Sequence, residues 1–256
     1  MEPNKFPTEI IDLPSQGYFY SQDNILSNGR IEIKYMTAKE EDILTSKNLI
    51  QKGIVLDKLL QSLIVTPINY DELMVGDKNA ILYAARVLAY GKDYRAEIEC
   101  PSCGKKSECT IDLSILNHKV IDFSKFTKGS EELEFELPSS KIKITVKLLR
   151  SRDERIIDDS LKGLKKISLQ TGVDFEITTR LKHIITSVNG DRSRDTINKF
   201  VSESLLSRDS LALRIYLQEL SPDLDSQFSF SCINCGTEKS LGIPLTVEFF
   251  WPGAKR

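Results

Sequence analysis

Several short segments of the chain place an apolar residue at every second position. In residues 30–36, two isoleucines and a tyrosine share one face of the segment. Residues 133–148 show the same alternation twice, on either side of a Pro-Ser-Ser turn at 138–140. Successive side chains of a strand point to opposite faces, so this period of two predicts strands. The interruption at 138–140 predicts that the two strands form a hairpin.

Other segments repeat their apolar residues every three or four positions, which is typical of an amphipathic helix. We expect helices over residues 55–65, 78–90, 152–167, 177–188, 196–206 and 209–220. Thr37, followed three residues later by Glu40, has the signature of a capping box and predicts a helix start. Asp77 is the expected N-cap of the helix that stops at Gly91. Gly163 is expected to interrupt the more polar helix over 152–167.

Two stretches, CPSCG at 100–104 and CINCG at 232–236, share one pattern. Alternating residues flank both stretches, so each predicts a turn at the tip of a hairpin, where glycine permits the positive φ that such turns require. Two thiolates separated by two residues can bind one ion. Two such tips supply four sulfurs, which suit a closed, tetrahedral, structural zinc site. We predict one structural zinc ion per chain, held by Cys100, Cys103, Cys232 and Cys235.

Other interpretations of the cysteines remain open. A redox-active Cys-x-x-Cys motif belongs between a strand and the start of a helix, a position that neither pair occupies. The 128 residues between Cys103 and Cys232 are a longer interval than ordinary zinc fingers contain. Cys109, the fifth cysteine, is interpreted as an ordinary strand residue. The alternative is that it exchanges with Cys103 as a ligand of the metal ion.

These patterns together predict an α+β fold. Helical segments surround a zinc-ribbon-like β module with four cysteines, which a long insertion splits in two. We expect an N-terminal arm and helical region at 1–92 and a first zinc knuckle with β hairpins at 93–150. A helical insertion follows at 151–222. The second knuckle and C-terminal tail at 223–256 are expected to pack against 93–150.

Composition narrows the class of protein. Of the 256 residues, 40% are hydrophobic and 28% are charged, as in ordinary globular proteins, and the formal net charge is −2. This charge gives no overall attraction to nucleic acid or anionic lipid. No apolar run approaches the roughly 20 residues that span a bilayer, and residues 1–17 lack the apolar stretch of a secretory signal. We therefore expect no membrane partner and a reducing cytoplasm, where paired cysteines bind metal more often than they form disulfides.

The sequence offers no grouping of residues suited to catalysis. The two histidines, His118 and His183, are interpreted as surface or boundary residues. The neighbouring acids at 40–41 and 158–159 diverge on a helix and cannot act as a pair. No phosphate-binding glycine loop or hydrolase motif occurs, and a four-thiolate zinc has no open coordination position. We predict that the chain is not an enzyme and has no small-molecule substrate.

Aromatic residues gather near both ends of the chain. Large aromatic side chains are common anchors in protein interfaces. The candidate partner-binding residues are Tyr18, Tyr20, Phe249, Phe250 and Trp251. Packing of these side chains on the protein's own core is an equally open interpretation.

Four stretches, in their order along the chain, resemble one known family. They are LPSQGYFY at 13–20, TAKEEDIL at 37–44, LIQKGIVLDKLLQSLI at 49–64 and the CPSCG knuckle. The chain is similar here to the baseplate hub subunit family of T-even-type contractile-tailed bacteriophages, closely up to Cys109 and more loosely through the second knuckle. The resemblance implies a structural or assembly component of the tail baseplate hub, acting by protein–protein contacts. Other hub and tail proteins are its implied partners. Its implied locations are the host cytoplasm during assembly and, if retained, the virion tail baseplate.

A zinc-ribbon regulator that binds nucleic acid is the alternative function, because zinc ribbons commonly serve that purpose. Such a protein needs a dense group of basic and aromatic residues to contact phosphates and bases. Near the knuckles the sequence offers only Lys105, Lys106 and Lys239. Nucleic acid is therefore not an expected partner.

Overall fold

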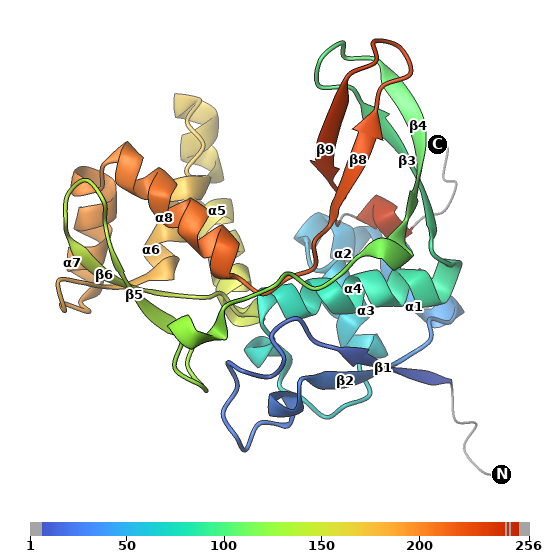
Figure 1. Ribbon diagram of the computed structural model, residues 1–256, viewed down its shortest axis with the longest axis horizontal. Coiled ribbons are helices and arrows are strands. Elements are labelled where there is room, and N and C mark those ends of the chain that lie inside the picture. Colours follow the sequence, from blue (N-terminus) through green and yellow to red (C-terminus); the bar gives the residue numbers. More distant parts are fainter. Residues whose placement is uncertain (1–6, 244, 246, 251–256) are drawn as a thin grey trace.

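The computed structural model describes residues 7–243, 245 and 247–250. Its helices and small antiparallel sheets confirm the α+β prediction (Figure 1). The N-terminal region begins with a hairpin and continues into helices. Its elements are β1 (Thr8–Asp12), β2 (Arg30–Lys34), α1 (Ala38–Thr45), α2 (Lys47–Lys52), α3 (Val55–Leu63) and α4 (Val75–Tyr90).

The start of α1 follows the predicted capping box. The backbone N–H of Thr37 donates to the Glu40 carboxylate at 2.9 Å, and the Thr37 hydroxyl donates to it at 2.6 Å. Glu40 also accepts from Lys34 and Ser62, at 2.8 and 2.6 Å. The carboxylate therefore joins β2, α1 and α3 as well as capping its own helix.

The start of α4 differs from the prediction. The helix begins at Val75, with Met74 as its N-cap, so Asp77 lies inside the first turn. The buried Asp77 carboxylate accepts from the backbone and hydroxyl of Ser15 and from the hydroxyl of Tyr20. These donors come from the loop after β1, so Asp77 joins that loop to α4. The prediction that Asp77 is the N-cap is therefore wrong.

A second region combines a three-stranded sheet, in the order β5-β6-β7, with helices. Its elements are β5 (Glu132–Glu136), β6 (Lys143–Lys147), α5 (Ser151–Thr171), α6 (Glu176–Ile184), β7 (Ile185–Val188), α7 (Arg194–Lys199), a π-helix (Phe200–Ser204) and α8 (Ser207–Leu220). The hairpin predicted over 133–148 is confirmed. Its third strand comes from the expected helical insertion, so the expected boundary at residue 150 divides one sheet.

Two helix predictions in this region need correction. Helix α5 continues through Gly163, because the cost of one glycine, about 1 kcal/mol, is too small to end a helix of this length. The helix expected over 177–188 ends at Ile184. Residues 185–188 instead form a strand, because the edge of β6 offers hydrogen-bond partners that sequence periodicity does not reveal.

Two further hairpins lie side by side and project from the N-terminal helices (Figure 1). One joins β3 (Asp93–Glu99) to β4 (Lys106–Asp112), and the other joins β8 (Gln227–Ser231) to β9 (Glu238–Gly242). Phe228 and Phe230 are buried, whereas Ser229 between them is exposed, so β8 has one packed face. We call these two hairpins, residues 93–112 and 227–242, the cysteine arm.

The chain enters and leaves the second region along two adjacent segments. The backbone N–H of Lys119 donates to the carbonyl of Asp223 at 2.9 Å, and His118 forms an isolated antiparallel bridge with Leu224. The helix α4 packs directly on the returning segment at Gly76. A Cβ atom there would lie 1.6 Å from the carbonyl oxygen of Pro222, so only glycine fits.

Candidate metal centre

The first cysteine pair lies in the turn that closes β3 and β4. The backbone N–H of Cys100 donates to the carbonyl of Lys105 at 2.9 Å, and that of Gly104 donates to the carbonyl of Cys100 at 2.8 Å. Gly104 has φ of +68°, in the left-handed region that favours glycine. This tight turn places Cys100 and Cys103 on the same side of the hairpin tip.

The second pair repeats the geometry of the first. The backbone N–H of Cys232 donates to the carbonyl of Thr237, and that of Gly236 donates to the carbonyl of Cys232, both at 2.9 Å. Gly236 has φ of +69°. The shared Cys-x-x-Cys-Gly pattern therefore produces the same turn twice, although the two copies lie far apart in sequence.

The two tips bring their sulfurs into one group. All four Sγ atoms lie within 4.8 Å of one another. The Sγ atoms of Cys100 and Cys235 are 3.7 Å apart, and those of Cys103 and Cys232 are 3.8 Å apart. Zinc–sulfur bonds of about 2.3 Å in a tetrahedron separate neighbouring sulfurs by about 3.8 Å, whereas a disulfide needs about 2.05 Å. The spacing fits a tetrahedral metal ion and excludes disulfides in this arrangement.

Hydrogen bonds favour the ionised form of two of the thiols. The hydroxyl of Thr237 lies 3.2 Å from the sulfur of Cys235 and, together with the backbone N–H of Thr237, lowers the pKa of Cys235 to about 6. Backbone N–H groups of Asn234 and Cys235 lower the pKa of Cys232. The second knuckle therefore supplies sulfurs that are readily deprotonated.

The thiol of Cys103 is harder to ionise than those of the second knuckle. A backbone hydrogen bond from Lys105 lowers the pKa of Cys103, but partial desolvation and contacts with the three neighbouring cysteines outweigh it and raise that pKa to about 11. Ionising every sulfur at once therefore requires a positive charge among them, which a bound divalent metal would supply.

Cys109 lies outside the group. It is on β4, opposite Ala96, and its sulfur is 4.0 Å from the carbonyl of Ser107. Thr237 is the contact to the cysteine group that the sequence analysis missed. A hydroxyl two residues after the last cysteine of a knuckle is the signal that could have indicated it.

The predicted aromatic anchors have different positions. Tyr20, Phe249 and Phe250 are at most 1% exposed, so of the two open interpretations core packing describes them in this structure. Apolar surface is more stable against the protein's own core than in water, and the polar Tyr20 hydroxyl has a buried partner in Asp77. Tyr18 is half-buried and remains a candidate. Trp251 lies outside the described residues.

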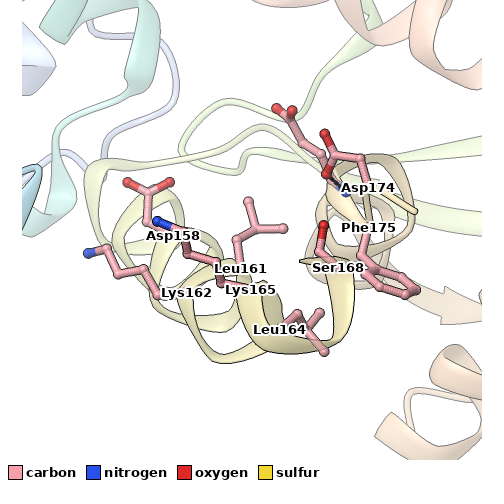
Figure 2. Close-up of a pocket in the computed structure, with 9 residues that line it drawn as sticks. Asp158, Leu161, Lys162, Leu164, Lys165, Ser168, Asp174 and Phe175 are labelled. Carbon is pink, nitrogen blue, oxygen red and sulfur yellow. Dashed lines mark hydrogen bonds between the residues drawn. The ribbon is translucent and has the colours of Figure 1, made fainter. Parts of the chain in front are cut away.

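An open groove of about 360 Å³ lies between α5 and the start of α6 (Figure 2). Asp158 and Lys162 lie toward one end of it, and Asp174 and Phe175 lie toward the other. Burial raises the pKa of Asp158. The lining residues include no cysteine or histidine, and their one hydroxyl is that of Ser168. The groove therefore lacks thiol and imidazole groups for catalysis.

No helix in the described part of the chain has both the length and the apolar character needed to cross a bilayer. The described residues thus present helices, short sheets and one group of four cysteines. These features define an α+β protein with a candidate metal site and do not by themselves define its biological role.

Comparison with known families supplies that role. A family model described as T4 bacteriophage base plate protein matches residues 13–251, which is most of the chain. The chain belongs to this family, and the resemblance noted in the sequence is confirmed as far as a T4-type baseplate protein. No curated protein and no solved structure matches the chain.

Proposed function

We propose that this protein is a structural or assembly component of the phage baseplate hub, and that one zinc ion holds its two knuckles together. It acts through contacts with other hub and tail proteins and not as an enzyme. It is present in the host cytoplasm during assembly and in the virion tail baseplate if it is retained.

The close approach of the four sulfurs supports the zinc ion. Cys100 and Cys232 are buried, whereas Cys103 and Cys235 are exposed at the tip of the arm. A closed site of this kind would contribute to folding, because four protein ligands leave no position for water or substrate. Its effect would be to fix two segments of the chain, 128 residues apart in sequence, as one rigid arm.

Family membership and the motifs at 13–20, 37–44 and 49–64 support the hub assignment. In the structure these motifs form the first loop, α1 and the α2–α3 segment, and they contribute buried residues such as Leu13, Leu44 and Leu59 to the core. The motifs that carry the resemblance therefore lie in the part of the chain that packs the N-terminal core.

The experiment is a pull-down of the tagged full-length chain from phage-infected cells, treated with nuclease and read by mass spectrometry. The proposal predicts recovery of other baseplate hub proteins at near-equal amounts. Recovery of wedge proteins without hub proteins would contradict the hub role. Recovery of nucleic-acid-processing proteins alone would favour the zinc-ribbon regulator instead.

A further inference from the structure

The β1–β2 hairpin has two outer edges, and they differ in how they are covered. On the outer edge of β2, the carbonyl of Glu32 accepts from the backbone N–H of Val65 at 2.9 Å. The backbone N–H of Glu32 donates to the hydroxyl of Thr66 at 2.8 Å. The segment after α3 therefore satisfies the middle of this edge.

The outer edge of β1 has no such cover. At one end of the hairpin, the backbone N–H of Leu13 donates to the carbonyl of Gly29. At the other end, the backbone N–H of Tyr35 donates to the carbonyl of Pro7. With the observed register, the odd-numbered residues of β1 face β2, and the backbone groups of residues 8, 10 and 12 point away from it. In the described part of the chain, these outward backbone groups have no hydrogen-bond partner.

The side chains of β1 protect this edge only in part. Natural edge strands use short length, charged residues (lysine above all), proline or a bulge to prevent pairing with another chain. Thr8–Asp12 is short and carries two carboxylates, but it is regular and has no lysine, proline or bulge. Ile10, at the centre of the strand, is 63% exposed. Its neighbours on the same face, Thr8 and Asp12, are polar. An unpaired backbone edge and an exposed isoleucine thus coincide at one point.

The sequence TEIID is complementary to itself when it is paired antiparallel about Ile10. Such a pairing places Ile10 opposite Ile10 of the other strand, Thr8 opposite Asp12, and Glu9 opposite Ile11. No carboxylate then lies directly opposite another carboxylate. In a parallel, in-register pairing, Glu9 and Asp12 would each lie beside their own copies, which is unfavourable.

We propose that β1 pairs antiparallel with β1 of a second copy of this chain, about a two-fold axis at Ile10. The two hairpins would then form one four-stranded sheet in the order β2-β1-β1-β2. A two-fold interface uses the same patch on both copies, which the self-complementary register allows. The strand is short, and the contact falls well below the roughly 800 Å² per partner of a standard interface. The dimer is therefore weak and dependent on concentration.

Sedimentation velocity on the full-length, metal-loaded protein tests this proposal. Over about 10 μM to 1 mM, the mass of the wild type should rise from the 29.0 kDa of one chain toward twice that value. Ile10→Lys places two ammonium groups opposite each other at the axis, so it should weaken association at least tenfold. Ile115→Lys, at a position 58% exposed elsewhere, is the matched control and should behave like the wild type.

A cross-linking experiment tests the register. After mild oxidation with diamide, Ile10→Cys should give a disulfide-linked dimer, because residue 10 is directly opposite itself. Glu9→Cys, which faces residue 11, should give much less, and the wild type serves as the background for the five native cysteines. A wild-type protein that stays monomeric at 1 mM, or equal cross-linking of both variants, would overturn the proposal.

Discussion

The cysteine arm and the N-terminal region of this protein are stabilised in different ways. In the N-terminal region, the elements from β1 to α4 follow one another directly along the chain, and apolar residues such as Leu59 and Leu60 are fully buried. Buried carboxylates of Glu40 and Asp77 there accept hydrogen bonds from several elements. Packing and hydrogen bonds thus hold this region together without a metal.

The arm brings together two hairpins from distant parts of the sequence, and each alone is a two-stranded sheet. An isolated hairpin is only marginally stable in water, so the arm needs a further constraint. The inward faces of Phe228 and Phe230 provide some burial, and the four sulfurs provide the link at the tip. If the proposed zinc ion is bound, the chain combines a region stabilised by its core with a region stabilised by an ion at its tip.

Among the substitutions, the loss of one cysteine sulfur should change the stability of the arm, relative to that of the N-terminal region, the most. Cys232→Ser removes one of the four sulfurs proposed to bind zinc and should destabilise the arm by several kcal/mol. Structural zinc ions bind small peptides with a free energy of about 10–16 kcal/mol, so the loss of one of four ligands is costly. Hydrogen exchange should become faster in residues 93–112 and 227–242 while α1 to α4 keep their protection. Cys109→Ser is the control and should leave exchange in the arm unchanged. Equal exchange in the two variants would contradict the account.

The junction at Gly76 should give the next largest effect. Gly76→Ala forces the Pro222 carbonyl away from α4 and should lower the free energy of unfolding by about 3 kcal/mol. Gly163→Ala is the matched control, because no atom lies within 4 Å of a Cβ built there. It should raise that free energy by about 0.5–1 kcal/mol, since alanine favours a helix. Denaturant unfolding of both variants measures the difference, and a neutral Gly76→Ala would contradict the close packing.

Glu40 gives a smaller effect that depends on pH. Burial opposes its ionisation, but hydrogen bonds from Lys34, Ser62 and Thr37 outweigh burial and lower its pKa to about 2. A lowered folded-state pKa adds stability above the ordinary value of 4.5, and this stability is lost as the pH falls from 4.5 toward 2.

Glu40→Gln should therefore cost about 1–3 kcal/mol at pH 7 and progressively less toward pH 2. Urea unfolding at several pH values, with the variant and wild type compared in the same metal-free buffer, measures this trend. A cost that did not change with pH would show that the charge of Glu40 does not matter.

An exposed ion pair should have the smallest effect. Arg180 and Glu176 lie 3.1 Å apart on α6, with side chains 37% and 54% exposed. Water and salt screen such pairs, so Arg180→Ala should change the free energy of unfolding by less than about 0.5 kcal/mol. Thermal unfolding at low and high salt would measure this, and a loss above 1 kcal/mol would indicate an additional contact.

Local rules predicted part of this structure correctly. The capping box at Thr37 and the hairpin over 133–148 depend on residues close in sequence, and both are present. The approach of the two cysteine pairs was also predictable, because both pairs carry the same motif and a tetrahedral site needs four ligands. A repeated motif with its own chemistry thus reveals a contact between distant segments.

Long-range contacts explain what the sequence did not reveal. Asp77 resembles an N-cap, yet donors from Ser15 and Tyr20 decide its role. The strand at 185–188 follows helical periodicity, yet the open edge of β6 decides its structure. Phe249 resembles an exposed anchor, yet it packs edge-to-face on Tyr83 and Tyr94 from other elements. In each of these three instances, the contacting residues lie about forty or more positions away in sequence, or no sequence motif indicates them.

We propose that one metal ion holds the two knuckles together. The most direct test is the zinc content of the full-length protein, purified without chelator and measured by inductively coupled plasma mass spectrometry against protein concentration. The account predicts one zinc ion per chain. A metal-free protein with its arm still folded would contradict it.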